Sequence, residues 1–153
     1  MPSISSTPAN HSAFCGAKLL CFVGGRLVVL LRDDVSTIPF PGHWDLPGGG
    51  REGGESPAAC VLRETRAEVG LALDPADLIW GRAYTVAGQT NWMFAAELPG
   101  RFERDLVLGD EGQRLDLMTP QDYGAHPLAI PQFVGRLADY LREKPSDQKT
   151  PRC

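Results

Sequence analysis

Residues 44–71, WDLPGGGREGGESPAACVLRETRAEVGL, combine a glycine-rich segment with a helix-forming segment. Ser56 and Pro57 predict the start of the helix, because a serine hydroxyl can cap free N–H groups and proline fits the first helical position. Gly70 predicts its end. The glycines before the helix predict a tight loop with room for a phosphate-sized group. The stretch therefore predicts a loop that leads into an amphipathic helix.

Acidic residues mark the outer face of this predicted helix. Glu64 and Glu68 are four residues apart and share one face, where like charges destabilise an isolated helix by about 0.2–0.5 kcal/mol. A compensating cation is therefore expected. Glu55, just before the helix, can add a third carboxylate, and clustered oxygen ligands favour Mg²⁺ or Mn²⁺ over zinc. The residues alone predict a divalent-metal site that could hold a diphosphate.

The spacing of these residues resembles the Nudix box, G-x5-E-x7-R-E-U-x-E-E-x-G-U, in which U is apolar. The pattern runs from Gly49 through Glu55, Arg63–Glu64 and Glu68 to Gly70–Leu71. Two positions depart from it, since Thr65 replaces an apolar residue and Ala67 replaces a glutamate. Helix ends fall where the box requires them.

The resemblance implies a fold and a reaction. The fold is an α/β protein of the α+β type, an α/β/α sandwich with a mixed β-sheet flanked by helices. The reaction is pyrophosphohydrolysis with Mg²⁺ or Mn²⁺ as cofactor, by water attack at phosphorus. The substrate is a small nucleotide-type molecule, a nucleoside diphosphate linked to another moiety, such as a nucleoside triphosphate. The resemblance does not identify the residues that bind the substrate.

By the same resemblance, four residues are expected to supply metal ligands, three glutamates within the box and Gly48 just before it. Glu68 is expected to be the central ligand and Glu64 a ligand or general base. Glu55 is expected to act as a ligand that can work through water, and the carbonyl of Gly48 is a further ligand. Glu64 and Glu68 are thus also expected to be catalytic.

Three further residues complete the expectation. Arg63, also assigned to the catalytic set, is expected to orient carboxylates by a bidentate bond. Glu111 lies in an acidic loop that resembles one supplying an additional metal ligand in MutT-type members. Ala67 stands where many members have a metal-contacting glutamate, which leaves the number of metal ions open.

The rest of the chain predicts one domain with a mixed sheet. Residues 1–12 are expected to form a flexible arm, 13–143 the hydrolase domain and 144–153 a flexible tail. Paired glycines predict a β-hairpin near the N-terminus. The expected strands are Phe14–Phe22, Leu27–Arg32, Trp44–Leu46, Arg82–Val86, Asn91–Glu97 and Arg114–Met118, and the expected closing helix is Pro131–Arg142.

Composition excludes several classes of function. The net charge of −4 over 153 residues argues against stable nucleic-acid binding. No apolar run approaches the roughly 20 residues of a membrane span, and no secretory signal is evident. Four cysteines without paired spacing predict reduced thiols, and hence a cytoplasmic protein. Both a monomer and a homodimer are compatible with the sequence.

Two other interpretations remain open at this point. The first is a catalytically degenerate Nudix domain that binds a nucleotide or a partner as a regulator, with Thr65 and Ala67 as its signs. The second is a structural protein whose acidic helix face is merely solvated. Arg32, a lone arginine beside the predicted hairpin, is interpreted as an exposed surface residue and is assigned no role.

Overall fold

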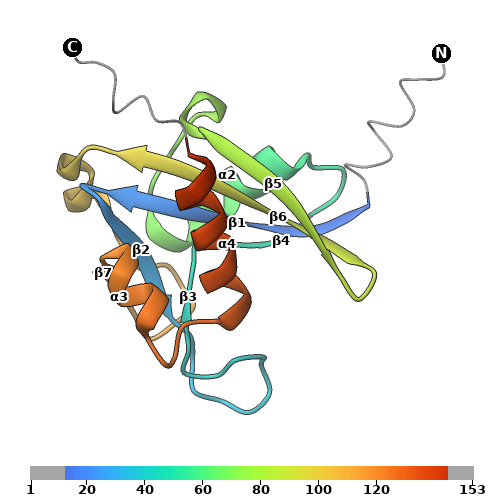
Figure 1. The fold of residues 1–153 in the computed structure, drawn as a ribbon, viewed down its shortest axis with the longest axis horizontal. Coiled ribbons are helices and arrows are strands. Elements are labelled where there is room, and N and C mark those ends of the chain that lie inside the picture. Colours follow the sequence, from blue (N-terminus) through green and yellow to red (C-terminus); the bar gives the residue numbers. More distant parts are fainter. Residues whose placement is uncertain (1–12, 145–153) are drawn as a thin grey trace.

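The computed structural model describes residues 13–144, which form a mixed sheet flanked by helices (Figure 1). The main strand order is β3-β2-β1-β6-β5, while β4 pairs with β1 and β7 pairs with β2. The strands are β1 (Phe14–Val23), β2 (Arg26–Leu31), β3 (Trp44–Asp45), β4 (Gly48–Gly50), β5 (Trp80–Val86), β6 (Gln89–Leu98) and β7 (Arg114–Met118). The helices are α2 (Pro57–Val69), α3 (Pro120–Ala125) and α4 (Pro131–Glu143), with the 3₁₀ turns η1 (Pro75–Asp77) and η2 (Gly100–Asp105).

Strand β1 is the centre of the sheet. It runs parallel to β6 along its whole length and antiparallel to both β2 and β4. The first half of β1 therefore has β4 on one side and β6 on the other, with Ala17 opposite Gly49 and Trp92. This pairing corrects the prediction of a free glycine loop, because residues 48–50 form a short strand against β1.

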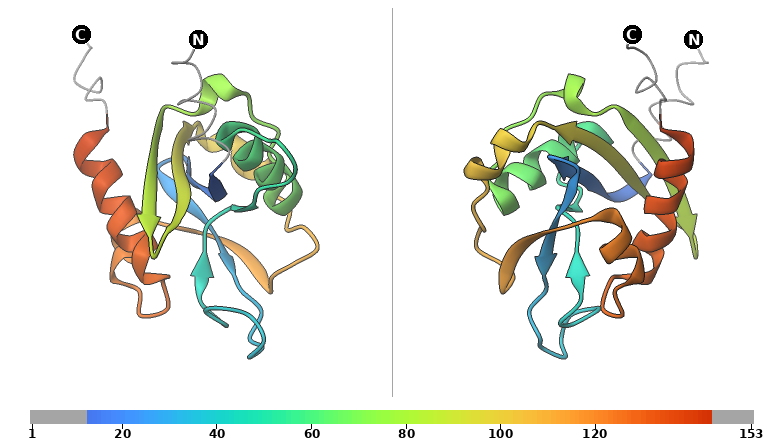
Figure 2. Two further views of the ribbon diagram at one scale, coloured as in Figure 1. Left: turned by 90° about the vertical axis from the view of Figure 1, so that its right-hand side faces the viewer. Right: turned by 60° about the vertical axis from the view of Figure 1, so that its left-hand side comes forward.

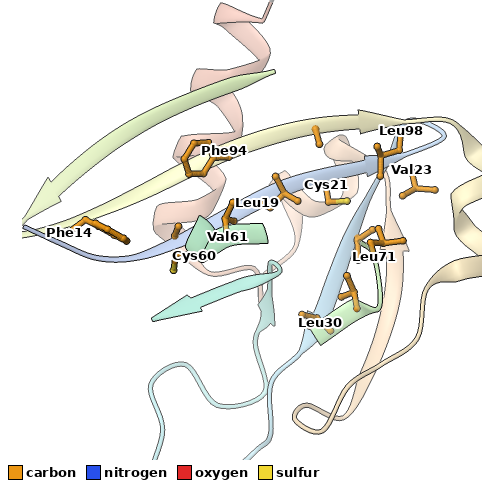
Figure 3. Packing of buried hydrophobic residues seen from close by; sticks show 14 residues of the cluster. Phe14, Leu19, Cys21, Val23, Leu30, Cys60, Val61, Leu71, Phe94 and Leu98 are labelled. Atoms are coloured by element: carbon orange, nitrogen blue, oxygen red, sulfur yellow. The ribbon is translucent and has the colours of Figure 1, made fainter. Parts of the chain in front are cut away.

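Alternation along β1 sends side chains to two apolar layers, one on each face of the sheet. Leu19 and Cys21 belong to the layer covered by α2 (Figure 3), whereas Leu20 and Phe22 belong to the layer covered by α3 and α4. The two side views show α2 and α4 on opposite sides of the sheet (Figure 2). The period of two in a strand thus produces the predicted sandwich.

Helix α2 begins and ends where the sequence predicts. Ser56 caps it, since its hydroxyl oxygen accepts a hydrogen bond from the Ala59 N–H at 3.1 Å. Gly70 ends it in the left-handed conformation with φ of 80°. The inner side of the helix includes Thr65, which is fully buried at the position where the box pattern has an apolar residue.

Four elements were not predicted: the strand β4, the helix α3 and the turns η1 and η2. The predicted strands and the closing helix are present, with ends that differ by one or two residues, as is common at element termini. Residues 1–12 and 145–153 of the predicted arm and tail lie outside the described residues. Lys144 closes α4 with a backbone bond to Tyr140 (2.7 Å), and its ammonium contacts Glu97 (3.1 Å).

Two properties bear on the expected environment of the chain. The described cysteines Cys15, Cys21 and Cys60 are free thiols. No helix within residues 13–144 has both the length and the apolar character needed to cross a bilayer.

Candidate metal centre and active site

The carboxylate of Glu68 is held against strand β4. Its Oε1 accepts a hydrogen bond from the Gly48 N–H at 3.1 Å, which joins the last turn of α2 to the glycine segment. Burial raises the pKa of Glu68 to about 7; Lys18 and the Gly48 N–H oppose this shift, whereas Asp45 and Glu64 add to it. Glu68 is therefore a half-buried carboxyl whose negative charge is incompletely compensated by the protein.

Glu64 lies over the backbone of the neighbouring glycine. A Cβ at Gly49 would stand 2.7 Å from the carboxyl carbon of Glu64 and 2.8–3.0 Å from its two oxygens. Only glycine lets the carboxylate come so close to β4. The structure thus brings both carboxylates of the predicted pair to adjacent residues of one strand.

Arg63 joins Glu55 to Glu64. Its Nε donates to Glu55 Oε2 at 2.5 Å and its Nη2 to Glu55 Oε1 at 3.1 Å, a bidentate pair, while Nη1 donates to Glu64 Oε2 at 3.1 Å. Nη2 also donates to the Gly50 carbonyl at 2.9 Å. The Arg63 guanidinium holds the pKa of Glu55 at about 2. Glu55 is therefore ionised and directed toward Arg63. Both oxygens of this predicted metal ligand already accept hydrogen bonds from Arg63.

Sequence reasoning missed a lysine at the centre of this region. Lys18 of β1 donates to the Gly48 carbonyl at 3.1 Å and to the Leu46 carbonyl at 3.2 Å, and it pairs with Asp45 at 3.1 Å. The carbonyl predicted as a metal ligand is thus bonded to an ammonium group. A signal existed, because Lys18 is a single charge inside the apolar run of residues 14–23.

Asp45 connects this lysine to an arginine. The carboxylate is nearly buried, with 8% of its side chain exposed, and it accepts a bond from Arg32 Nη1 at 2.8 Å. Arg32 itself is only 26% exposed and also donates to the Pro39 carbonyl. The expectation that Arg32 is an exposed surface residue is therefore wrong, since a buried carboxylate draws its guanidinium inward.

Glu111 is on the exposed loop before β7, and this loop is bonded to the Glu68 carbonyl through the Gly109 N–H at 2.9 Å. It lines a small hollow together with Arg32, Asp33 and Asp45. No group of three or more Asp, Glu, His or Cys side chains suited to hold a metal ion occurs among residues 13–144. A metal bound here would therefore take backbone oxygen and water among its ligands, as Mg²⁺ commonly does.

The donor set fits a hard divalent cation. Glu64 and Glu68 offer carboxylate oxygens at β4, whereas the Gly48 carbonyl, the third expected donor, accepts a bond from the Lys18 ammonium. Oxygen donors of this kind suit Mg²⁺ and Mn²⁺. A nearby cation lowers the pKa of a carboxyl, whereas the pKa of Glu68 is raised. Binding of a divalent cation would therefore keep Glu68 ionised at a lower pH.

A larger cavity begins beside the same strand. It has a volume of about 640 Å³, within the usual range for small-molecule sites. Gly49 and Gly50 line it on the side of β4, and Lys18 lines it from β1. The remaining lining residues come from the first half of β1, from the β5–β6 hairpin and from α4. The carboxylate pair thus lies next to a space of nucleotide size.

Comparison with known proteins assigns the chain to a protein family. The NUDIX domain profile matches residues 16–140, most of the chain. The chain belongs to the NUDIX family. The predicted membership, the mixed sheet with flanking helices and the assignment as a MutT-like hydrolase are thereby confirmed.

Individual proteins are similar to this chain in sequence or in fold. An RNA pyrophosphohydrolase of Gluconobacter oxydans is 31% identical over 127 residues, which cover 72% of this chain and 66% of that protein. The MutT protein of Methanosarcina mazei has a TM-score of 0.65 at 21% identity, covering 84% of this chain and 92% of the other. A bifunctional NMN adenylyltransferase/ADP ribose pyrophosphatase of Francisella tularensis, complexed with AMP and a manganese ion, has a TM-score of 0.67 at 15% identity. That match covers 92% of this chain and 47% of the other.

Proposed function

We propose that this Nudix chain hydrolyses a phosphoanhydride bond in a small molecule built as a nucleoside diphosphate linked to another moiety, with Mg²⁺ or Mn²⁺. The observation that carries the proposal is the half-buried carboxylate of Glu68, held by the Gly48 N–H beside Glu64. Two acidic side chains are thereby kept together beside β4, where burial raises the pKa of Glu68.

Each residue of the pair has a distinct task in this proposal. Glu68, Glu64 and the Gly48 carbonyl would hold the metal, with Glu68 as the central ligand. When bound, the metal neutralises phosphate oxygens and assists the ionisation of a water molecule. Glu64 lies beside the cavity-lining Gly49 and is the candidate base that accepts a proton from that water.

Arg63 is the positioning residue of this set. Its bidentate bond to Glu55 and its bond to Glu64 fix two carboxylates relative to the Gly50 carbonyl. Glu55 is proposed to reach a metal only through water, because Arg63 already occupies both of its oxygens. Glu111, on its exposed loop, is proposed as an additional ligand that approaches from the side of Asp45.

The cavity beside β4 is the proposed place of the nucleotide. Its volume of about 640 Å³ and its polar lining from Gln89, Asn91 and Gln132 suit a polar ligand of that size. The activities named for the relatives supply the substrates to try first. They are 5′-triphosphorylated RNA and ADP-ribose, to which nucleoside triphosphates, nucleotide sugars and dinucleoside polyphosphates are added.

The proposal is tested by measuring product release from this panel with Mg²⁺, with Mn²⁺ and with EDTA. Wild type is compared with Glu68→Gln and with Glu103→Gln, a matched control whose carboxylate is 57% exposed and pairs with Arg26 at the surface. Metal-dependent release is expected for wild type and Glu103→Gln, with a loss of at least about 100-fold in Glu68→Gln. Release that survives EDTA or the Glu68→Gln substitution would refute the proposal.

A second candidate function is nucleotide binding without turnover. Two observations favour it: Ala67 lacks the usual carboxylate, and Lys18 is bonded to the carbonyl that the metal would need. Nucleotide affinity in the absence of any product release from the whole panel would favour this candidate. Metal-dependent release from one substrate would exclude it.

A further inference from the structure

Arg136 is a buried arginine that faces the cavity beside β4. It lies on α4, only 8% of its surface is exposed, and its side chain forms part of the cavity lining together with Gly49 and Gly50. Arginine is rarely buried to this extent unless its charge is paired. The partners of its guanidinium are therefore informative.

Aromatic rings are the partners that the structure shows. The guanidinium carbon lies 4.5 Å from the ring centroid of Tyr84 and 5.8 Å from that of Phe133. The Arg136 guanidinium forms no hydrogen bond or ion pair with any other residue of the 13–144 range. These cation–π contacts do not use the N–H groups of the guanidinium as hydrogen-bond donors to oxygen.

Asp139, the acidic side chain that acts electrostatically on Arg136, is already used by other groups. Asp139 accepts bonds from the Tyr84 hydroxyl at 2.7 Å and from Arg142 at 2.6 Å, and it pairs with Arg82 at 3.7 Å. Burial lowers the pKa of Arg136, which is the expected sign for a guanidinium without a close counterion. A buried cation that lies over two aromatic rings and has no hydrogen-bonded counterion thus lines a cavity of nucleotide size.

We propose that Arg136 binds a second phosphate of the substrate, one attached to the ribose rather than belonging to the diphosphate that is cleaved. The planar guanidinium can donate two parallel bonds to phosphate oxygens, and its contact with the Tyr84 ring at 4.5 Å holds it at the cavity wall. The inference rests on the proposed function for the placement of the diphosphate near Glu68. It adds a preference for nucleotides that carry a 2′- or 3′-phosphate.

The test compares nucleotides that differ by one phosphate. Dissociation constants of adenosine 5′-monophosphate, adenosine 2′,5′-bisphosphate and adenosine 3′,5′-bisphosphate, and of the matching guanosine compounds, are measured calorimetrically in EDTA, where no turnover occurs. Wild type is expected to bind one bisphosphate at least about 10-fold more tightly than its monophosphate, the magnitude of a charge-assisted hydrogen bond. In Arg136→Gln the difference is expected to fall within twofold, and Arg136→Lys should retain part of it.

Arg101→Gln is the matched control, because Arg101 also lies over an aromatic ring, that of Phe102, but is exposed on η2. It should keep the wild-type preference. Equal affinity for mono- and bisphosphates in wild type, no detectable binding of any of them, or a preference that persists in Arg136→Gln would each overturn the inference.

Stability measurements separate loss of binding from loss of folding. An unpaired buried cation opposes folding, so Arg136→Met should unfold at a urea concentration equal to or higher than that of wild type, while losing the bisphosphate preference. Failure of the proposed function gives a different result. The protein would then still prefer bisphosphates but would release no product in the presence of metal.

Discussion

The hydroxyl of Thr65 is fully buried in α2 and has no hydrogen-bond partner among the described residues. Thr65→Val should therefore raise the free energy of unfolding by about 1 kcal/mol, because a buried unsatisfied polar atom is removed without a change of shape. Urea unfolding measures the difference. Thr85→Val, at an exposed site, should shift stability by no more than about 0.5 kcal/mol. A less stable Thr65→Val would show that the hydroxyl is satisfied in solution.

The raised pKa of Glu68 makes the stability of the metal-free protein depend on pH. Folding shifts this pKa from 4.5 to about 7, so in that window the folded protein keeps a proton that the unfolded chain has released. Stability should fall as pH rises from 4.5 to 7, by up to about 3 kcal/mol from this group. Glu68→Gln should remove that fall, because glutamine keeps the acceptor for the Gly48 N–H but cannot ionise.

Urea unfolding in EDTA at pH 5 and at pH 8 measures this effect. Glu68→Gln should be more stable than wild type at pH 8 and close to it at pH 5. The exposed Glu103→Gln serves as control and should follow the wild-type profile. A parallel pH profile for Glu68→Gln and wild type would mean that Glu68 is solvated and titrates normally.

Ala67 occupies an exposed position between the buried Thr65 and the half-buried Glu68. Ala67→Glu should tighten Mn²⁺ binding by roughly 10-fold, because a further carboxylate is added beside Glu64 and Glu68. Ala59→Glu adds the same charge to an exposed site in the first turn of the same helix and should leave the affinity within about twofold. An unchanged affinity for Ala67→Glu, measured by calorimetric titration, would place position 67 away from the metal.

At the scale of elements, strand β4 depends on the absence of side chains. A Cβ at Gly48 would stand 2.2 Å from the Ala17 carbonyl oxygen, and its φ of 135° strains any other residue. Gly48→Ala should therefore destabilise the protein by about 2 kcal/mol or more and should detach β4 from β1. Gly50→Ala, which meets no atom within 4 Å, is the matched control in the same strand and should unfold like wild type.

Local signals explain which elements were predictable. The cap residues Ser56 and Gly70 set both ends of α2 through contacts within a few residues. The same kind of signal was present for α3, where Thr119 caps the helix and Pro120 takes its first position, but the helix is only six residues long and lacks an apolar repeat. The glycines of β4 indicated a tight backbone, whereas their pairing with β1 depends on residues some 30 positions earlier.

At the scale of the whole molecule, the site is assembled from segments that are far apart in the sequence. Glu64 and Glu68 could be predicted together because one helix turn joins them. Lys18 and Asp45 could not, since their pairing requires β1 and β3 to be brought together by the sheet. Arg136 lines the cavity beside β4 only because α4 crosses the face of β5 and β6 (Figure 2). Distances between such segments follow from the tertiary fold and leave no pattern in the sequence.

The most direct test of the central claim is an Mn²⁺ binding isotherm for wild type, Glu68→Gln and Glu103→Gln at pH 7.5. If the carboxylates beside β4 hold the metal, wild type and Glu103→Gln should bind Mn²⁺ equally, and Glu68→Gln should bind it at least about 10-fold more weakly. Equal affinity in all three proteins would contradict the assignment of Glu68 as the central ligand and, with it, the proposed catalytic site.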